Sequence, residues 1–127
     1  MTQTTVFEVV GGQPFFDELV ERFYERVEHD AVLRPVYPDD LRPGIRALAL
    51  FLGQYWGGPT TYSDEKGHPR LRMRHAPFVI TGRERNAWLA AMLASIDDVD
   101  EADAPEAARE LMRDYFTTAS TAMINQY

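Results

Sequence analysis

The chain has 127 residues, 45% of them hydrophobic and 12% aromatic, and a formal net charge of −7. These values predict a single globular domain over residues 1–127 with a core large enough to hold a ligand. The negative charge argues against nucleic acid as a partner, and the absence of cysteine excludes disulfides, thiolate catalysis and iron–sulfur clusters. The N-terminus has no basic region followed by an apolar run, and no apolar stretch is long enough to span a bilayer. We therefore expect a cytoplasmic protein with no membrane insertion.

Apolar residues spaced three and four positions apart predict an all-α fold, and no segment shows the alternation of a strand. In the first half of the chain, helices are expected over residues 6–10, 13–29 and 43–56. Residues 30–42 contain two prolines and are expected to form a tight corner. The paired Gly57-Gly58 ends the third helix.

Two tyrosines of this half place polar groups near the expected core. Tyr24 falls on the apolar face of the helix over residues 13–29, where a buried hydroxyl needs a polar partner. A backbone acceptor inside the core satisfies that need as well as a ligand does, so both interpretations stay open. Tyr37 follows Pro35 in the tight corner and can project into whatever the helices enclose.

The second half predicts a polar loop over residues 59–68 and then a short helix of about two turns, which Pro69 starts and Pro77 stops. Two longer helices follow over residues 82–96 and 105–125, joined by an acidic linker. Their apolar faces are expected to carry Trp88 in the first and Leu111, Met112 and Phe116 in the second.

His75 stands at the C-terminal end of the short helix, beside apolar residues that include Phe78. A neutral imidazole on a short rigid support suits a metal site with a single histidine ligand. From spacing alone, a histidine buried in the core or capping the helix is the favoured interpretation of this position. Tyr62, His68 and Arg74 flank the same region, and either bind an anionic group or belong to a solvated loop.

Four fragments occur in the order typical of one protein family. They are Arg22-Phe-Tyr-Glu-Arg-Val27, Val36-Tyr-Pro-Asp39, Gln54-Tyr-Trp-Gly-Gly-Pro59 and the stretch from His68 to Phe78. Trp88 follows thirteen residues after His75. With these fragments the chain resembles the group II truncated haemoglobins over nearly its whole length. The resemblance implies a two-over-two helical sandwich around haem b, which contains iron.

The resemblance also implies roles for individual residues. His75 matches the proximal iron ligand, and Tyr24, Tyr37 and Trp88 match the polar residues of the distal side. Gly44 stands where most globins carry a distal histidine or glutamine, so the distal hydrogen bonds are expected from the tyrosines and the tryptophan.

Other positions are expected to contact the macrocycle. Leu48 matches a distal apolar residue, and Phe51 and Phe78 are expected against the haem. The haem propionates need cationic or hydroxyl partners. Arg74 is the first candidate, followed by Tyr62 and His68.

The expected function is binding of oxygen and other diatomic ligands at the iron, with tight binding and slow release. One alternative is redox chemistry on the bound ligand, as a peroxidase or a nitric oxide dioxygenase. That chemistry needs an external reductase, since the chain carries no flavin or nicotinamide motif. A second alternative is a haem-free helical module that binds a partner or an apolar ligand. The sequence does not decide whether the protein is an oxygen carrier or an enzyme. It is also compatible with a homo-oligomer.

Overall fold

The computed structural model describes residues 4–126 of the chain, and the regular elements within this range are all helical. The seven α-helices and one 3-10 helix are α1 (Val6–Val9), α2 (Gln13–Glu28), η1 (Arg34–Val36), α3 (Arg42–Tyr55), α4 (Thr61–Lys66), α5 (Leu71–His75), α6 (Gly82–Asp97) and α7 (Glu106–Ala122). None of these helices combines the length and the apolar character that crossing a bilayer requires.

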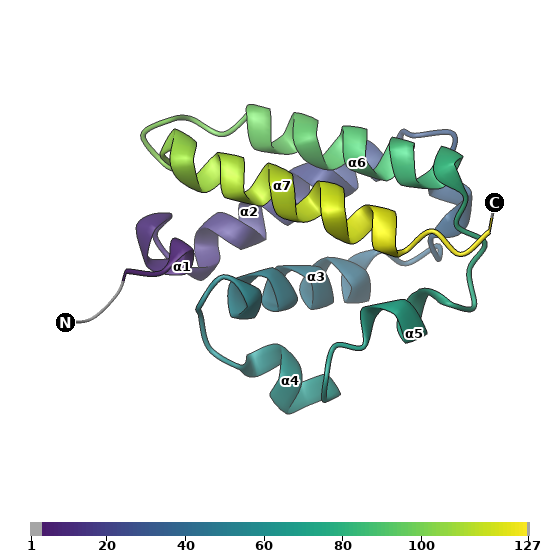
Figure 1. Cartoon of the computed structure of the whole chain (residues 1–127), viewed down its shortest axis with the longest axis horizontal. Coiled ribbons are helices and arrows are strands. Elements are labelled where there is room, and N and C mark those ends of the chain that lie inside the picture. Colours follow the sequence, from purple (N-terminus) through teal and green to yellow (C-terminus); the bar gives the residue numbers. More distant parts are fainter. Residues whose placement is uncertain (1–3, 127) are drawn as a thin grey trace.

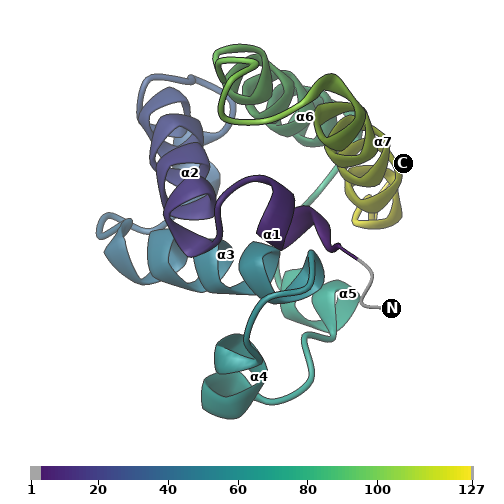
Figure 2. The ribbon, with the colours of Figure 1, turned by 90° about the vertical axis from the view of Figure 1, so that its left-hand side faces the viewer.

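The four long helices form two pairs. Helices α6 and α7 lie side by side on one side of the molecule, and α2 and α3 pack together on the other (Figure 1). Viewed from the end of the molecule, α4 and α5 lie beyond α3, away from α2 and α6 (Figure 2). Helix α2 contacts both α3 and α6 and so joins the two pairs.

The core lies between the two pairs because each long helix carries apolar side chains on one face. Its largest fully buried side chains are Phe16, Leu19, Phe23, Leu52, Met92, Ile96, Met112 and Phe116. Full burial of one such side chain contributes about 1.5–3 kcal/mol. The faces expected for these helices are therefore confirmed, with two exceptions. Tyr55, which the same spacing places on the inner face of α3, is 50% exposed. Leu111 is 52% exposed, so its expected place in the core is wrong.

The glycines after α3 let α1 approach closely. Gly57 has φ 109°, a conformation that favours glycine. A Cβ on Gly58 would lie 2.5 Å from the Phe7 ring. Phe7 N–H donates to the Trp56 carbonyl at 2.9 Å, so the backbone also ties α1 to the end of α3.

The segment over residues 59–68 is not an irregular loop as expected, because α4 occupies most of it. Gln54 fixes this helix with two hydrogen bonds. Its Oε1 accepts from Ser63 N–H at 3.0 Å and its Nε2 donates to Ser63 Oγ at 2.7 Å. Tyr62 is the one buried side chain of α4. A six-residue helix with a single buried position has no repeating apolar pattern, so the sequence did not predict it.

The helix that carries His75 is shorter than expected. Helix α5 begins at Leu71, after Arg70 in the left-handed conformation at φ 44° and ψ 53°. The expectation that Pro69 occupies the first helical position is therefore wrong. The Arg74 guanidinium explains the difference, because it holds the carbonyls of Lys66 and Pro69 at 2.9 and 2.6 Å and keeps this stretch outside the helix. The stop before Pro77 is confirmed.

The start of α6 confirms a capping signal that the sequence carries. Thr81 Oγ1 accepts from Arg83 N–H at 3.2 Å, and the Glu84 side chain accepts from Thr81 N–H at 2.9 Å. These bonds satisfy donors that the first turn of a helix otherwise leaves free. They fix the direction in which α6 leaves the segment after His75.

Candidate haem-binding site

His75 is oriented by its own helix. Its Nδ1 lies 2.6 Å from the carbonyl oxygen of Leu71, one turn earlier. Because a carbonyl only accepts hydrogen bonds, Nδ1 carries the proton and Nε2 keeps its lone pair. A metal-ligating histidine typically has this arrangement, in which the second ring nitrogen donates to a backbone carbonyl. The half-buried ring is therefore prepared to bind a metal through Nε2.

Asn125, beyond the end of α7, holds the segment that follows His75. Its Nδ2 donates to the carbonyls of Phe78 at 2.8 Å and His75 at 3.3 Å, and its Oδ1 accepts from Ile80 N–H at 2.9 Å. Its own backbone N–H donates to the Ile80 carbonyl at 2.9 Å. The C-terminal segment thus fixes where α5 ends. The sequence analysis missed this residue, because no local pattern marks a bond across fifty positions.

Asn125→Ala is expected to speed haem loss several-fold. Loss of a group bonded to a metal-ligating side chain typically weakens metal binding by about 10- to 100-fold. A smaller effect is expected here, because Asn125 bonds only the backbone of His75. Transfer of haem to excess apomyoglobin measures the rate. Asn125→Asp keeps the acceptor for Ile80 N–H but loses the amide donor. Its rate of haem loss should therefore lie between those of the wild-type protein and Asn125→Ala. Unchanged haem loss beside lowered stability to unfolding would limit Asn125 to a general structural role.

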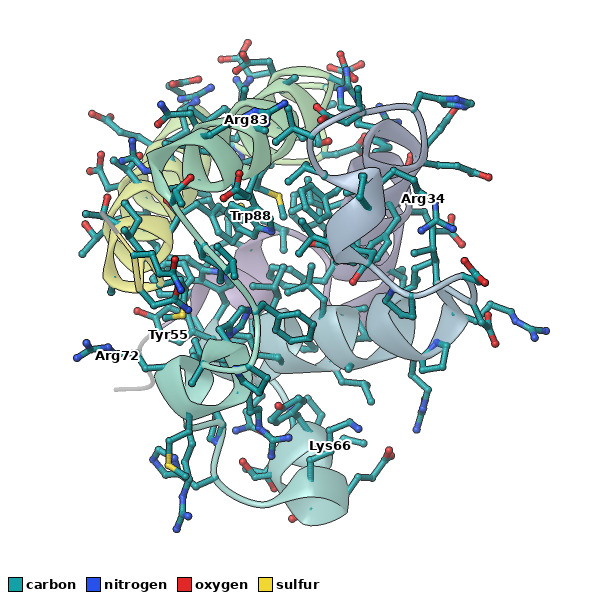
Figure 3. The ribbon with its side chains drawn as sticks, turned by 90° about the vertical axis from the view of Figure 1, so that its right-hand side faces the viewer. Arg34, Tyr55, Lys66, Arg72, Arg83 and Trp88 are labelled. Carbon is teal, nitrogen blue, oxygen red and sulfur yellow. The ribbon has the colours of Figure 1, made fainter. Side chains whose placement is uncertain are left out.

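Three polar side chains gather on the side of the site that α2 and α6 form. The rings of Tyr24 and Tyr37 meet edge to face with centroids 5.6 Å apart. Trp88 packs on Phe23 at 5.2 Å and on Phe116 at 5.7 Å. In Figure 3, Trp88 lies beneath α6, with α5 below it. Tyr24 belongs to α2, Trp88 to α6 and Tyr37 follows η1, so these donors come from elements other than the helix of His75.

Both tyrosines remain protonated donors at neutral pH. Burial raises the pKa of Tyr24 to about 12. Burial also raises the pKa of Tyr37, as does the neighbouring Tyr24, while a hydrogen bond from Trp88 opposes that rise. A neutral phenol can donate a hydrogen bond, whereas a phenolate can only accept one. The site therefore presents two O–H groups and one indole N–H.

Gly44 makes room for the Tyr24 hydroxyl. A Cβ at position 44 would lie 2.7 Å from that oxygen, while the next closest atom of the ring, Cζ, would lie at 3.4 Å. Any larger residue on α3 here would displace the hydroxyl. The position of the Tyr24 hydroxyl thus depends on glycine at position 44.

Gly44→Ala is expected to move the Tyr24 hydroxyl and raise the rate of oxygen release up to about tenfold, the value of a weak charge-assisted hydrogen bond. In a Tyr24→Phe background the same substitution should have little effect, because the clashing oxygen is gone. Rapid mixing of the oxygenated protein with carbon monoxide measures the rate. Equal effects in both backgrounds would show that the methyl group acts elsewhere.

The expected apolar contacts lie on several elements. Phe51 is buried in α3 and meets the ring of Tyr62 edge to face at 5.5 Å. Leu48 is half-buried and packs against the core. Phe78, after α5, is 46% exposed. Apolar surface left open beside a histidine suits a flat apolar ligand better than a closed core does.

The candidates for binding the propionates are brought together only in part. Tyr62 is buried, and the guanidinium carbon of Arg74 lies 5.9 Å from the centre of its ring. His68 is exposed, and its Nδ1 accepts from Arg70 N–H at 3.1 Å. Arg74 also binds the two loop carbonyls described above. Their roles toward the propionates stay predictions.

The donor set of the site fits haem. Within residues 4–126, no cluster of three or more histidine, aspartate or glutamate side chains could hold a metal ion without further ligands. Haem iron needs few protein ligands because the macrocycle supplies ring nitrogens and a single axial imidazole completes the attachment. His75, whose Nδ1 lies against the Leu71 carbonyl, has the chemistry of such an imidazole, and Tyr24, Tyr37 and Trp88 are uncharged donors on other elements.

Comparison with known proteins agrees with this geometry. The bacterial-like globin family matches residues 5–124. Group 2 truncated hemoglobin YjbI of Bacillus subtilis strain 168 is 46% identical over 88 residues, which cover 69% of this chain and 67% of that protein.

Solved structures match the whole fold. The hemoglobin of the thermophilic phototrophic bacterium Chloroflexus aurantiacus is 52% identical with a TM-score of 0.92, covering 98% of this chain and 100% of that one. The group II truncated hemoglobin of Bacillus anthracis is 38% identical with a TM-score of 0.90, covering 98% of each chain. The expected two-over-two fold and haem b cofactor are confirmed. The chain therefore belongs to the bacterial-like globin family, as a truncated haemoglobin of group II.

Proposed function

We propose that this globin, which binds oxygen and other diatomic ligands through haem, holds oxygen tightly and releases it slowly. The observation that supports the proposal is a set of three uncharged donors, Tyr24, Tyr37 and Trp88, which one run of aromatic contacts through Phe23 holds together. Membership of the globin family sets aside the alternative of a haem-free module.

His75 would hold haem b through Nε2, with Leu71 fixing the ring orientation. When bound, haem b supplies an iron with an open position and shifts electron density onto a diatomic ligand there. Preplaced donors stabilise such developing charge without reorganising. Tyr24, Tyr37 and Trp88 are held by aromatic packing, so little conformational entropy is lost when they donate.

The expected size of the effect follows from the number of donors. One charge-assisted hydrogen bond contributes about 1.5–3 kcal/mol, so each good donor slows ligand release by about 10- to 100-fold. Two or three such donors make a poor rapid carrier. They suit storage of oxygen or reaction of the held ligand with a second molecule.

Two finer expectations accompany this function. We expect the protein in the cytoplasm, and we expect an external reductase to keep the haem ferrous, since the chain has no nicotinamide or flavin motif. The proposed function does not depend on the oligomeric state, because all the proposed ligand-binding groups belong to one chain.

The test is the absorption spectrum of the purified protein. A Soret band that shifts when oxygen is added to the reduced protein is expected. The oxygenated spectrum should then persist after dilution into oxygen-free buffer. Decay of that spectrum within the mixing time would contradict slow release, and a protein that takes up no haem when haem is supplied would contradict the cofactor.

A further inference from the structure

The basic residues of this acidic chain are concentrated in one segment. Residues 66–85 contain six of the thirteen basic residues and one of the twenty acidic residues. We call these six side chains the cationic face: Lys66, Arg70, Arg72, Arg74, Arg83 and Arg85. The remainder of the chain holds seven basic residues against nineteen acidic ones. Positive charge is therefore gathered locally on a protein whose net charge is −7.

The cationic face also differs in its pairing. Elsewhere, six of the seven basic residues form ion pairs with carboxylates at 3.2 Å or less: Arg22, Arg26, Arg42, Arg46, Arg109 and Arg113. Among residues 4–126, no carboxylate pairs with any member of the cationic face. Arg74 donates to two carbonyls, and Arg85 donates to Asn86 and Thr121. The one acidic residue of the segment, Glu84, caps α6 through Thr81.

The cationic face surrounds the helix of the proximal histidine. Its members lie at the end of α4, on and beside α5, and at the start of α6. In Figure 3, Lys66 and Arg72 lie below near α4 and α5, and Arg83 lies above on α6. All except Arg85 are exposed. An uncompensated positive surface therefore lies on both sides of the segment that carries His75.

We propose that the cationic face docks a small acidic electron-transfer protein of the flavodoxin class, which reduces the haem. The proposal rests on haem binding at His75. Opposite charges raise association rates by about 10- to 1000-fold, and electron-transfer complexes are typically small and weak. The haem propionates neutralise only part of six positive charges. A compact anionic protein suits the face better than nucleic acid, because the acidic surface beyond it would repel an extended polyanion.

The electron count of the step balances. The reduced flavodoxin, an anionic flavin hydroquinone, gives up one electron and becomes the neutral semiquinone. That electron converts one ferric haem to ferrous haem, and no proton moves. The side chains of the cationic face take no part in the transfer. They hold the acidic donor beside α5 while it occurs.

The experiment compares two double variants with the wild-type holoprotein. Arg72→Glu/Arg83→Glu reverses two exposed charges of the cationic face. Arg26→Glu/Arg42→Glu makes the same change in net charge on α2 and α3, outside the cationic face. Calorimetry measures binding of oxidised flavodoxin, and flash photolysis measures haem reduction by photoreduced flavodoxin. Photoreduced lumiflavin, a neutral free flavin, serves as a donor that needs no docking.

The wild-type protein should bind flavodoxin and lose about tenfold or more of its reduction rate between about 0.01 and about 0.5 M salt. At low salt, Arg72→Glu/Arg83→Glu should be about tenfold slower and insensitive to salt. The Arg26→Glu/Arg42→Glu control should keep most of the rate, and lumiflavin should reduce all three proteins alike.

Equal flavodoxin rates in the two double variants would overturn the proposal. So would retention of duplex DNA or anionic vesicles at physiological salt without any binding of flavodoxin. Failure of the wild-type protein to take up haem would instead contradict the proposed function. A normal Soret band and a normal lumiflavin rate separate that failure from a failure of docking.

Discussion

Replacing His75 by glycine is expected to weaken haem retention by at least about 100-fold, the upper limit of what losing an outer-shell partner alone costs. In the proposed site His75 is the imidazole that the haem would lose, and its ring is oriented by the contact of Nδ1 with the Leu71 carbonyl. Transfer of haem to excess apomyoglobin measures retention.

Added imidazole should restore the Soret band of His75→Gly, because the free ring can enter the space of the lost side chain. The matched control is His29→Gly, which removes an exposed histidine that caps α2. This variant should retain haem like the wild-type protein. If His75→Gly retained haem as well as the His29 control, His75 would not be the iron ligand.

Much of the fold follows from local sequence patterns. The face of α2 is regular over sixteen residues, so its buried side chains repeat at helical spacing. The partner of His75 also obeys a local rule, since Leu71 lies four residues earlier in the same helix and its carbonyl points toward the next turn. The face of α2 was predictable because helical spacing within one segment sets it, and the contact of His75 with Leu71 likewise lies within one helix.

Contacts between distant segments escaped the sequence analysis. Asn125 meets His75 across fifty positions, and Arg26 pairs with Asp98 across seventy-two. No periodicity encodes such pairs, so neither the anchor after α7 nor the unpaired state of the cationic face was predictable. Leu111 failed for a related reason. It lies at the edge of the apolar stripe of α7, where the position of the neighbouring helix decides burial.

Removing the distal donors should accelerate oxygen release strongly. Tyr24→Phe and Trp88→Phe are each expected to raise the dissociation rate by about 10- to 100-fold, which corresponds to losing about 1.5–3 kcal/mol of hydrogen bonding. Phenylalanine keeps the ring packing of Tyr24, so the lost donor is the main change there, whereas at Trp88 it removes the N–H together with part of the packing on Phe23 and Phe116. Tyr37→Phe should act in the same direction, because its ring meets that of Tyr24 edge to face at 5.6 Å and its hydroxyl belongs to the same group of donors. Rapid mixing of the oxygenated protein with carbon monoxide measures each rate.

The matched control is Tyr55→Phe, which removes a half-exposed hydroxyl from the far end of α3, where the ring packs on Tyr115 at 4.1 Å. Its oxygen release should equal that of the wild-type protein. Carbon monoxide takes up less negative charge than oxygen, so its release should change much less in Tyr24→Phe and Trp88→Phe. Oxygen release at the wild-type rate in both single variants, Tyr24→Phe and Trp88→Phe, would show that these donors do not hold the ligand.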